Sequence, residues 1–219
     1  MMIQYAEVTK QNGAIIALDQ EKAYDRLTHD YLWKTLETFE VPTYFINTIK
    51  ALYKDTETKV IINGVKSKPF KVTRGVRQGD PISCFLFNLG IEPLACMIRN
   101  DKRIAGYNIP GTEEQLIINL FADDTVLYLN VNDSMKVTTQ ILDRWCDASG
   151  AKFNKEKTEI IPIRTKEHRT KMIRSRKLNQ EDTTIANDVH IAQEGEAIRS
   201  LGAWVGNVTQ DQTPWESIR

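Results

Sequence analysis

The sequence predicts an α+β fold in which helices back an antiparallel β-sheet. Two pairs of apolar runs are each joined by a short polar turn, which is the pattern of a β-hairpin. Several longer segments instead repeat their apolar residues at helical spacing. Because strands and helices do not alternate regularly, a parallel sheet built from βαβ units is not expected.

The first part of the chain predicts one buried strand and two covering helices. Residues 14–18 are an apolar run followed by Asp19, so we expect a strand that delivers an acid at its C-terminal end. Thr28 or Asp30 can cap a helix, and Pro42 separates that helix from a second one. Their apolar faces consist of Tyr31, Leu32, Trp33, Leu36 and Phe39, and then of Tyr44, Phe45, Ile46, Ile49, Leu52 and Tyr53.

A hairpin is predicted next. Residues 59–62 and 65–72 flank the dipeptide Asn63-Gly64. Asn-Gly readily adopts the positive φ angles of a type I′ turn, which matches the twist of two antiparallel strands. We therefore expect these two runs to pair.

A polar loop and a long helix follow this hairpin. Within residues 74–81, Asp80 and Pro81 suit the N-cap and the first position of a helix. The helix should run from Pro81 to about Arg99. A bend or an interruption is expected near Pro93, because proline removes a backbone donor and crowds the preceding turn.

A second hairpin with an acidic turn is predicted in the middle of the chain. The apolar runs 116–121 and 126–129 flank residues 122–125, which include Asp123 and Asp124. A further helix over residues 134–149 carries its apolar side chains at helical spacing and stops at a glycine. Those side chains are Met135, Val137, Ile141, Leu142 and Trp145, and the glycine is Gly150. Strands are expected over residues 158–163 and 198–205.

Residues 164–178 are the only strongly basic tract of the chain. They contain Arg164, Lys166, Arg169, Lys171, Arg174, Arg176 and Lys177 against the single acid Glu167. Such a tract could add electrostatic affinity for an RNA or DNA backbone. It contains no aromatic residue on which bases could stack, so we interpret residues 164–188 as a charged, mobile loop.

Composition excludes several classes of protein. Lys plus Arg and Asp plus Glu both number 29, so the net charge is zero and any nucleic-acid footprint must be local. Apolar runs such as residues 14–18 fall far short of the roughly 18 residues of a membrane span, and Met1 begins no leader. We therefore expect an intracellular protein, nuclear or cytoplasmic. The cysteines Cys84, Cys96 and Cys146 are widely spaced, so neither zinc nor disulfides are expected.

Three acids form the candidate site. Asp123 and Asp124 are adjacent in an apolar hairpin, where two like charges repel each other and lose solvation. A divalent cation such as Mg²⁺ would explain them, and Asp19 could join them if its strand were a neighbour in the sheet. A solvated Asp-Asp turn is the alternative, and metal-dependent hydrolysis would use the same three acids.

Five motifs resemble those of reverse transcriptases, and they occur in the order of that family. Residues 19–25 resemble the first motif, in which an Asp is followed at fixed spacing by Ala, an aromatic residue and Asp. Residues 121–124 resemble the third motif, and their initial Phe121 is typical of non-LTR, LINE-type retrotransposons rather than of the related group II intron and retron enzymes. The second motif corresponds to residues 74–83 with 86–88, the fourth to residues 150–158, and the fifth, the primer grip, to residues 200–202.

The resemblance implies an RNA-directed DNA polymerase that adds a dNTP to a DNA primer on an RNA template. Asp19 and Asp123 would hold two Mg²⁺ ions, for which Mn²⁺ could substitute, and Asp124 would be a supporting acid. Lys157 would protonate or neutralise the departing pyrophosphate, with an ordinary surface lysine as the alternative.

Further residues would contact the substrates. Tyr24, which replaces a more common Phe, would lie under the sugar of the incoming nucleotide and exclude a 2′-hydroxyl. The alternative is that Tyr24 is an aromatic residue packed in the core. Gln78 and Gly79 would form the loop beside the nascent base pair, or else a plain polar turn. Arg77 or Arg74 would contact phosphate or template, or either would be a solvated surface cation. Ser200 stands where an aromatic residue is usual in the primer grip.

The expected organisation is that of a polymerase palm with a remnant of fingers and no complete thumb. Residues 1–163 would be the palm core with partial fingers, residues 164–188 the basic loop, and residues 189–219 the end of the palm with the start of a truncated thumb. Fingers, thumb and nuclease regions of a longer element would be missing. The alternative function is a catalytically inactive retroelement fragment or a co-opted nucleic-acid-binding module.

Overall fold

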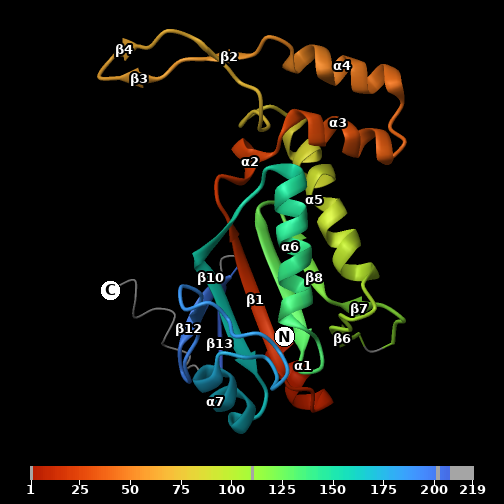
Figure 1. Ribbon diagram of the computed structural model, residues 1–219, viewed down its shortest axis with the longest axis vertical. Coiled ribbons are helices and arrows are strands. Elements are labelled where there is room, and N and C mark those ends of the chain that lie inside the picture. Colours follow the sequence, from red (N-terminus) through yellow and green to blue (C-terminus); the bar gives the residue numbers. More distant parts are fainter. Residues whose placement is uncertain (1, 110, 201–202, 208–219) are drawn as a thin grey trace. The chain divides into compact units, whose positions relative to one another are not determined.

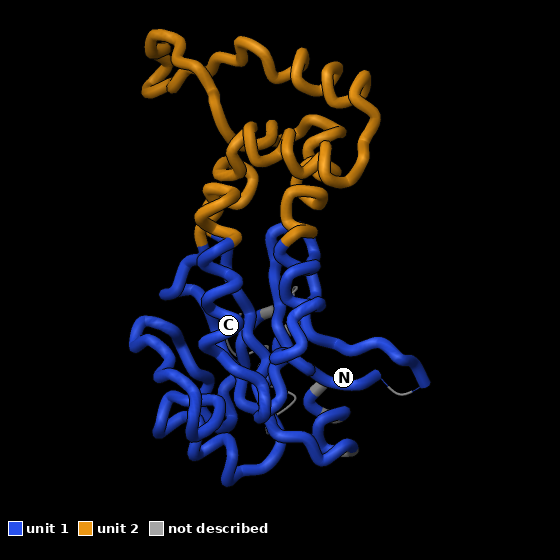
Figure 2. The backbone as a smooth tube through the Cα atoms, turned by 45° about the vertical axis from the view of Figure 1, so that its right-hand side comes forward, with its two compact units in different colours: residues 1–20, 94–144, 153–219 blue, residues 21–93, 145–152 orange. Residues whose placement is uncertain are grey.

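The computed structural model describes residues 2–109, 111–200 and 203–207, and the chain divides into two compact units (Figure 2). Unit 1 comprises residues 1–20, 94–144 and 153–219, and unit 2 comprises residues 21–93 and 145–152. The chain therefore passes between the units several times. None of the described helices combines the length and the apolar character that crossing a membrane requires.

Unit 1 is built on a five-stranded sheet with β1 at its centre (Figure 1). From edge to edge its strands are β11 (His190–Ile191), β10 (Phe153–Ile163), β1 (Gly13–Gln20), β9 (Asp124–Asn130) and β8 (Ile118–Phe121). All neighbours are antiparallel except β10 and β11, which are parallel. The predicted α+β class with an antiparallel sheet is confirmed.

The central strand is buried along almost its whole length because it has a partner strand on each side and apolar side chains on each face. One core cluster of unit 1 gathers side chains from the sheet, from helix α1 (Met2–Thr9) and from the C-terminal strands. Its buried members are Ala6, Ile15, Tyr107, Val126, Ile161, Ile163, Ala192 and Ile198. Helix α1 was not predicted from the sequence.

Unit 2 contains the predicted helices α3 (His29–Thr38) and α4 (Thr43–Tyr53), preceded by the short helix α2 (Ala23–Arg26). The predicted hairpin is confirmed: β3 (Ile61–Ile62) pairs with β4 (Val65–Lys66). Asn63 and Gly64 have φ angles of 50° and 81°, as a type I′ turn requires. Farther from the turn, β2 (Glu57–Thr58) pairs with β5 (Phe70–Lys71).

The two long helices contribute residues to both units. Helix α5 (Ser83–Asn100) begins two residues after the expected start, and an Asp80 carboxylate oxygen accepts a hydrogen bond from the Ile82 amide at 3.1 Å. It continues through Pro93 as one helix, so the expected interruption is absent from it. Helix α6 (Met135–Ser149) ends before Gly150, whose φ of 79° confirms the predicted stop.

Three parts of unit 1 differ from the sequence prediction. Residues 164–188 are not simply a loop, because helix α7 (Lys166–Ser175) forms within them. The single strand expected over residues 198–205 is an antiparallel pair, β12 (Ala197–Ser200) and β13 (Ala203–Gly206). A small ladder of β6 (Tyr107–Asn108) and β7 (Gln115–Leu116) was not predicted.

Gly75 joins the segment after β1 to the loop before α5 within unit 2. Its amide donates to the Leu27 carbonyl at 2.6 Å, and the next amide, that of Val76, donates to the Tyr24 carbonyl at 2.7 Å. Gly75 has a φ of +83°, and a Cβ there would lie 2.8 Å from the Asp25 Cα and 2.8 Å from the Tyr24 carbonyl oxygen. Only glycine satisfies both the left-handed backbone and this close approach.

We expect Gly75→Ala to lower the free energy of unfolding by about 2–5 kcal/mol, because the left-handed conformation and the steric overlap both penalise alanine. Gly64→Ala is the matched control, since Gly64 has a φ of +81° but nothing within 4 Å of the place that an added methyl group would occupy. It should lose only about 1 kcal/mol. Urea denaturation followed by tryptophan fluorescence compares the two variants, and equal losses would contradict the role of close packing at Gly75.

Candidate active site

The register of the central strands brings Asp19 beside Asp124. In the ladder between β1 and β9, Leu18 is paired with Thr125, so Asp19 and Asp124 are the next residues along the two antiparallel strands. Residues opposite each other on neighbouring strands point to the same face of a sheet, so both carboxylates lie on one face. The pairing therefore brings together two acids that are far apart in the sequence.

Asp123 lies in the tight turn between β8 and β9. Phe121 pairs with Asp124 across this hairpin, and Ala122 adopts a left-handed conformation with a φ of 53°. The predicted hairpin with an acidic turn is confirmed. Phe121, the residue before the turn, is 70% exposed, which is unusual for a phenylalanine and leaves an aromatic ring in solvent beside the acids.

Gln20 fixes the backbone of the acidic turn, a role that no sequence pattern indicated. Its side-chain amide donates to the Asp123 carbonyl and to the Thr125 hydroxyl, each at 3.2 Å. Gln20 is buried, and its side-chain oxygen has no hydrogen-bond partner among the described residues. The residue that follows Asp19 on β1 therefore ties the acidic turn to the central strand.

The three acids repel one another. Partial burial, together with the charges of Asp123 and Asp19, raises the pKa of Asp124 above its ordinary value. Among the described residues, no lysine, arginine or histidine forms an ion pair with any of the three carboxylates. Their negative charge is therefore not neutralised by the part of the chain that the structure describes.

The donor set suits a divalent cation. Mg²⁺ prefers carboxylate oxygens, and a cation here would relieve the repulsion that raises the pKa of Asp124. Over residues 2–109, 111–200 and 203–207, however, no three Asp, Glu, His or Cys side chains are grouped closely enough to hold an ion. Asp19 is partly exposed, and Asp123 and Asp124 are exposed, so these side chains have room to turn toward one.

Glu21 is close to these acids in sequence but differs from them in its partners. Its carboxylate pairs with Lys152 at 2.8 Å and with Arg26 at 2.7 Å. These hydrogen bonds, first that from Lys152 and then that from Arg26, lower the pKa of Glu21 to about 2. Glu21 is therefore neutralised by side chains of unit 2, whereas the three aspartates have no such partner in the described part of the chain.

Lys157 lies in an irregular part of β10 next to the strand segment that carries Asp19. Glu159 pairs with Ala17 and Asn154 pairs with Asp19, so the single residue Leu18 faces the four residues 155–158. The extra residues form a bulge in which Lys157 is exposed. Lys157 is therefore exposed to solvent on β10, the strand that pairs with β1 beside Asp19.

The expected substrate contacts Tyr24, Arg77, Gln78 and Gly79 all lie in unit 2. Tyr24 stacks on Phe87 with ring centroids 4.6 Å apart and an angle of 9° between the planes. Gln78 and Gly79 are exposed, and Gly79 has a φ of +84° with nothing within 4 Å of the place that a Cβ would occupy. The loop therefore needs glycine there for its backbone conformation and not because of crowding.

Arg77 makes several contacts within unit 2. Its guanidinium donates to the Leu52 carbonyl and, at 2.7 Å, to the Thr56 hydroxyl, and it lies 5.1 Å from the centre of the Tyr53 ring. These contacts attach the loop after β5 to the end of α4. The structure thus engages Arg77 within unit 2, although the residue remains exposed.

The expected primer grip is only partly described. Ser200 pairs through its backbone with Ala203, whereas Leu201 and Gly202 lie outside the described residues.

The solved structures that are similar to this fold include telomerases. One from Candida albicans, in complex with a fragment of telomeric RNA, gives a TM-score of 0.53 at 14% identity and covers 93% of this chain and 31% of that one. One from Candida tropicalis, also with telomeric RNA, gives 0.50 at 16% identity and covers 74% and 28%. Together with the antiparallel sheet and its acids, this likeness defines the fold as a polymerase palm.

The sequence comparisons name the family. Residues 2–194 match the model described as reverse transcriptase (RNA-dependent DNA polymerase). The transposon TX1 149 kDa protein of Xenopus laevis is 32% identical over 157 residues, and the R2DM retrotransposon polyprotein of Drosophila melanogaster is 31% identical over 155. The matches cover 72% and 68% of this chain, which spans only 12% and 14% of those relatives. The chain belongs to the reverse transcriptase family, within the group found in non-LTR retrotransposons.

We expect Asp124→Asn to stabilise the metal-free protein at pH 7. A carboxyl group whose folded pKa is raised contributes stability that is present below its ordinary pKa and is lost as the pH rises through the raised value. Removing the charge should therefore raise the free energy of unfolding at neutral pH by up to about 1 kcal/mol, because the group is exposed. The gain should vanish at a pH below 3.8, the ordinary pKa of this carboxyl.

Thermal unfolding in EDTA at several pH values measures this effect. Asp143→Asn is the control, since Asp143 is an exposed acid on the part of α6 that belongs to unit 1. A gain from Asp124→Asn that equals the control, or that grows as the pH falls, would contradict electrostatic repulsion at the site.

Proposed function

We propose that the chain catalyses RNA-directed DNA synthesis, in which the 3′-hydroxyl of a DNA primer attacks the α-phosphate of a dNTP on an RNA template. The new bond joins the primer oxygen to this phosphorus, and the bond to the leaving pyrophosphate breaks. The observation that carries the proposal is the strand register that places Asp19 beside Asp124, next to the turn that holds Asp123.

In this proposal Asp19 and Asp123 hold two Mg²⁺ ions, for which Mn²⁺ could substitute, and Asp124 adds negative charge to the same site. When bound, these ions would lower the pKa of the primer hydroxyl and neutralise charge that develops on the phosphates. Partial burial and the charges of Asp123 and Asp19 raise the pKa of Asp124, which supports the proposal because a cation would relieve the repulsion between these acids.

Lys157 is proposed to donate a proton to the departing pyrophosphate or to neutralise its charge. Its exposed position in the bulge of β10, on the strand that neighbours β1, supports this role. The bulge frees the lysine from the regular ladder, so its long side chain has room to reach a phosphate.

The proposed contacts of unit 2 rest on the sequence motifs. Tyr24 would exclude the 2′-hydroxyl of a ribonucleotide, and its stacking on Phe87 would keep the ring rigid. Gln78 and Gly79 would lie beside the nascent base pair, and their exposure supports access to a substrate. Arg77 would contact phosphate or template, and its hydrogen bonds to a residue of α4 and to the segment after it would hold the loop in position.

The domain roles are also part of the proposal. Residues 1–163 would supply the palm core with partial fingers, and residues 164–188 a basic segment that includes α7. Residues 189–219 would include the end of the palm and the start of a thumb, of which residues 208–219 lie outside the described part of the chain.

We expect Asp123→Asn to reduce primer extension on an RNA template by on the order of 100-fold or more, because it removes a charge that acts in the transition state. The assay uses the purified chain with Mg²⁺ and dNTPs. Asp143→Asn removes one exposed carboxylate elsewhere in unit 1 and should leave the rate unchanged.

Extension that is unaffected by Asp123→Asn would overturn the mechanism. If the wild-type chain bound template and primer but added no nucleotide, a catalytically inactive nucleic-acid-binding protein would replace the proposed function. Release of monophosphate from dNTP without a primer would point instead to a hydrolase.

We expect Tyr24→Ala to increase incorporation of ribonucleotides relative to deoxynucleotides by on the order of tenfold, because the smaller side chain leaves room for one hydroxyl group. Tyr24→Phe keeps the ring and its stacking on Phe87, so it should retain the wild-type preference. Ratios of kcat/KM for matched nucleotide pairs measure the effect. Equal preferences in Tyr24→Ala and the wild type would refute the proposed steric role.

A further inference from the structure

Helix α7 has one buried face and one exposed face. On the buried face, Met172 is 1% exposed, and a ring nitrogen of His168 lies 3.1 Å from the Gly13 carbonyl oxygen at the start of β1. The Thr165 side chain caps the helix by accepting a hydrogen bond from the His168 amide. The helix is therefore packed against the sheet of unit 1, and its other face is presented to solvent.

Two of the arginines in the basic tract hold the fold together. Arg169 forms a two-point ion pair with Glu194, at 2.6 and 2.9 Å, and is only 7% exposed. Arg176 donates hydrogen bonds from its guanidinium to the carbonyls of Ile185, Ala186 and Val189. Both guanidinium groups are therefore engaged within the fold of unit 1.

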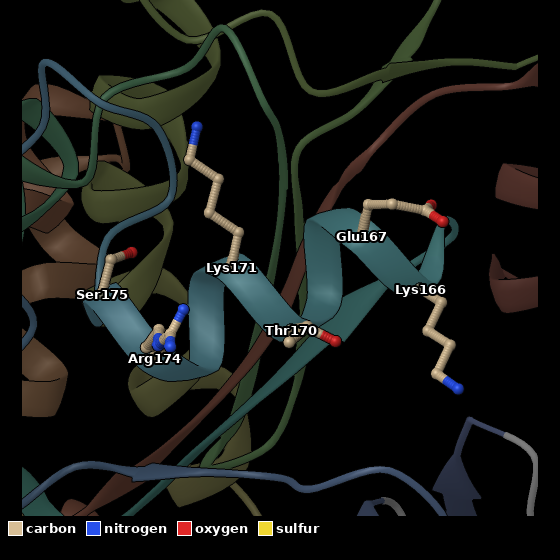
Figure 3. Close-up of a pocket in the computed structure, with 6 residues that line it drawn as sticks. All are labelled: Lys166, Glu167, Thr170, Lys171, Arg174 and Ser175. Atoms are coloured by element: carbon tan, nitrogen blue, oxygen red, sulfur yellow. The ribbon is translucent and has the colours of Figure 1, made fainter.

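Of the other five basic side chains of the tract, Arg164 is half-buried with its Nε shielded from solvent, and four, of which Lys177 is half-buried, lie at the surface of this region. These four are Lys166, Lys171, Arg174 and Lys177, and none of them forms an ion pair with another described residue. In Figure 3, Lys166 and Lys171 extend in different directions from the helix, with Thr170 between them. We call these four residues the α7 cation group.

The α7 cation group borders two hollows that share Lys171 and Ser175. The first, of about 510 Å³, is lined by Lys166, Lys171 and Arg174 and also by the acid Glu167 (Figure 3). The second, of about 580 Å³, is lined by Lys171, Lys177 and the neutral amides Asn132, Asn179 and Gln180, and by the acid Glu181. Four cations against two acids leave a positive surface in a chain whose net charge is zero.

We propose that the α7 cation group binds the phosphate backbone of double-stranded nucleic acid, independently of base sequence. Lysine and arginine on a surface bind phosphates and release condensed counterions, which makes such binding strongly dependent on salt. Residues 164–178 include no aromatic side chain, so they lack the stacking platform by which proteins hold single strands. Duplexes, in contrast, are bound largely through phosphates and shape.

This surface is separate from the candidate active site. Helix α7 follows β10 at Ile163, which pairs with Gly13 at the start of β1, whereas Asp19 lies near the opposite end of that strand (Figure 1). Asp19 is six positions along β1 from Gly13, or roughly 20 Å at the rise of an extended strand. The inference therefore goes beyond the proposed function and does not require catalysis.

Binding is measured with the full chain carrying Asp123→Asn, so that nucleotide addition cannot alter the nucleic acid. The measurement does not depend on catalysis, so it remains valid if the polymerase proposal fails. The probes are an RNA duplex, an RNA–DNA hybrid and a DNA duplex, each of about 20 base pairs, which exceeds the ~16 that a duplex-binding domain covers. Fluorescence anisotropy gives the affinity between about 50 and 200 mM salt. The three probes distinguish RNA from DNA as the source of the phosphates.

The test variant combines Lys166→Gln, Lys171→Gln and Arg174→Gln, and glutamine retains helix propensity at these positions. For at least one duplex, the plot of log affinity against log salt should become less steep by about 3 units of slope. The affinity for that duplex near 0.15 M salt should decrease by on the order of 100-fold. Glu167→Gln, which removes the acid beside these cations, should strengthen binding. Primer extension on a short template should be unchanged in an otherwise wild-type chain.

The matched control combines Lys10→Gln, Lys102→Gln and Lys136→Gln, which removes three positive charges from lysines elsewhere in unit 1. Thermal unfolding confirms that each variant folds. An equal loss of affinity in the control, or no loss in the test variant, would overturn the proposal. Binding to phosphatidylserine vesicles without binding to any duplex would overturn it as well.

Discussion

The pairing of β1 with β9 on one side and β10 on the other is the constraint on which the rest of unit 1 depends. The strand is buried on both faces almost throughout, and a shift of one residue would exchange the side chains that pack on its two faces. The hydrophobic core therefore fixes the register. That same register makes Asp19 and Asp124 neighbours, so the stability of the sheet and the geometry of the acids have one physical cause.

The acids are tolerated because they lie where the ladder ends. Asp123 and Asp124 are exposed at a tight turn, and Asp19 follows the last buried pair of β1. These positions lie close to water, so the partial burial and the repulsion that raise the pKa of Asp124 do not disrupt the core. Gln20 holds the turn through two hydrogen bonds, which keeps the backbone of the acidic turn beside the end of β1 although the acids repel one another.

Local patterns predicted most of the elements, because each depends on residues that are neighbours in sequence. The Asn63-Gly64 turn, the acidic hairpin and the helices of unit 2 are of this kind. The environment of Arg77 and the bulge around Lys157 could not be predicted, because they depend on partners in other elements. Sequence motifs named the three acids, but only the strand register explains why Asp19 lies beside Asp124.

Helix α7 shows why a count of charges did not predict this part of the structure. From its sequence alone, a tract rich in lysine and arginine resembles a solvated loop. Its contacts in the fold are with residues outside the tract: His168 contacts Gly13, which lies far earlier in the chain, and Arg169 pairs with Glu194, which follows the tract. The fold divides the cations by their contacts: Arg169 is buried in an ion pair, whereas Lys166 and Lys171 remain at the surface. A neutral chain can thus present a local positive surface, because its opposite charges are not evenly mixed.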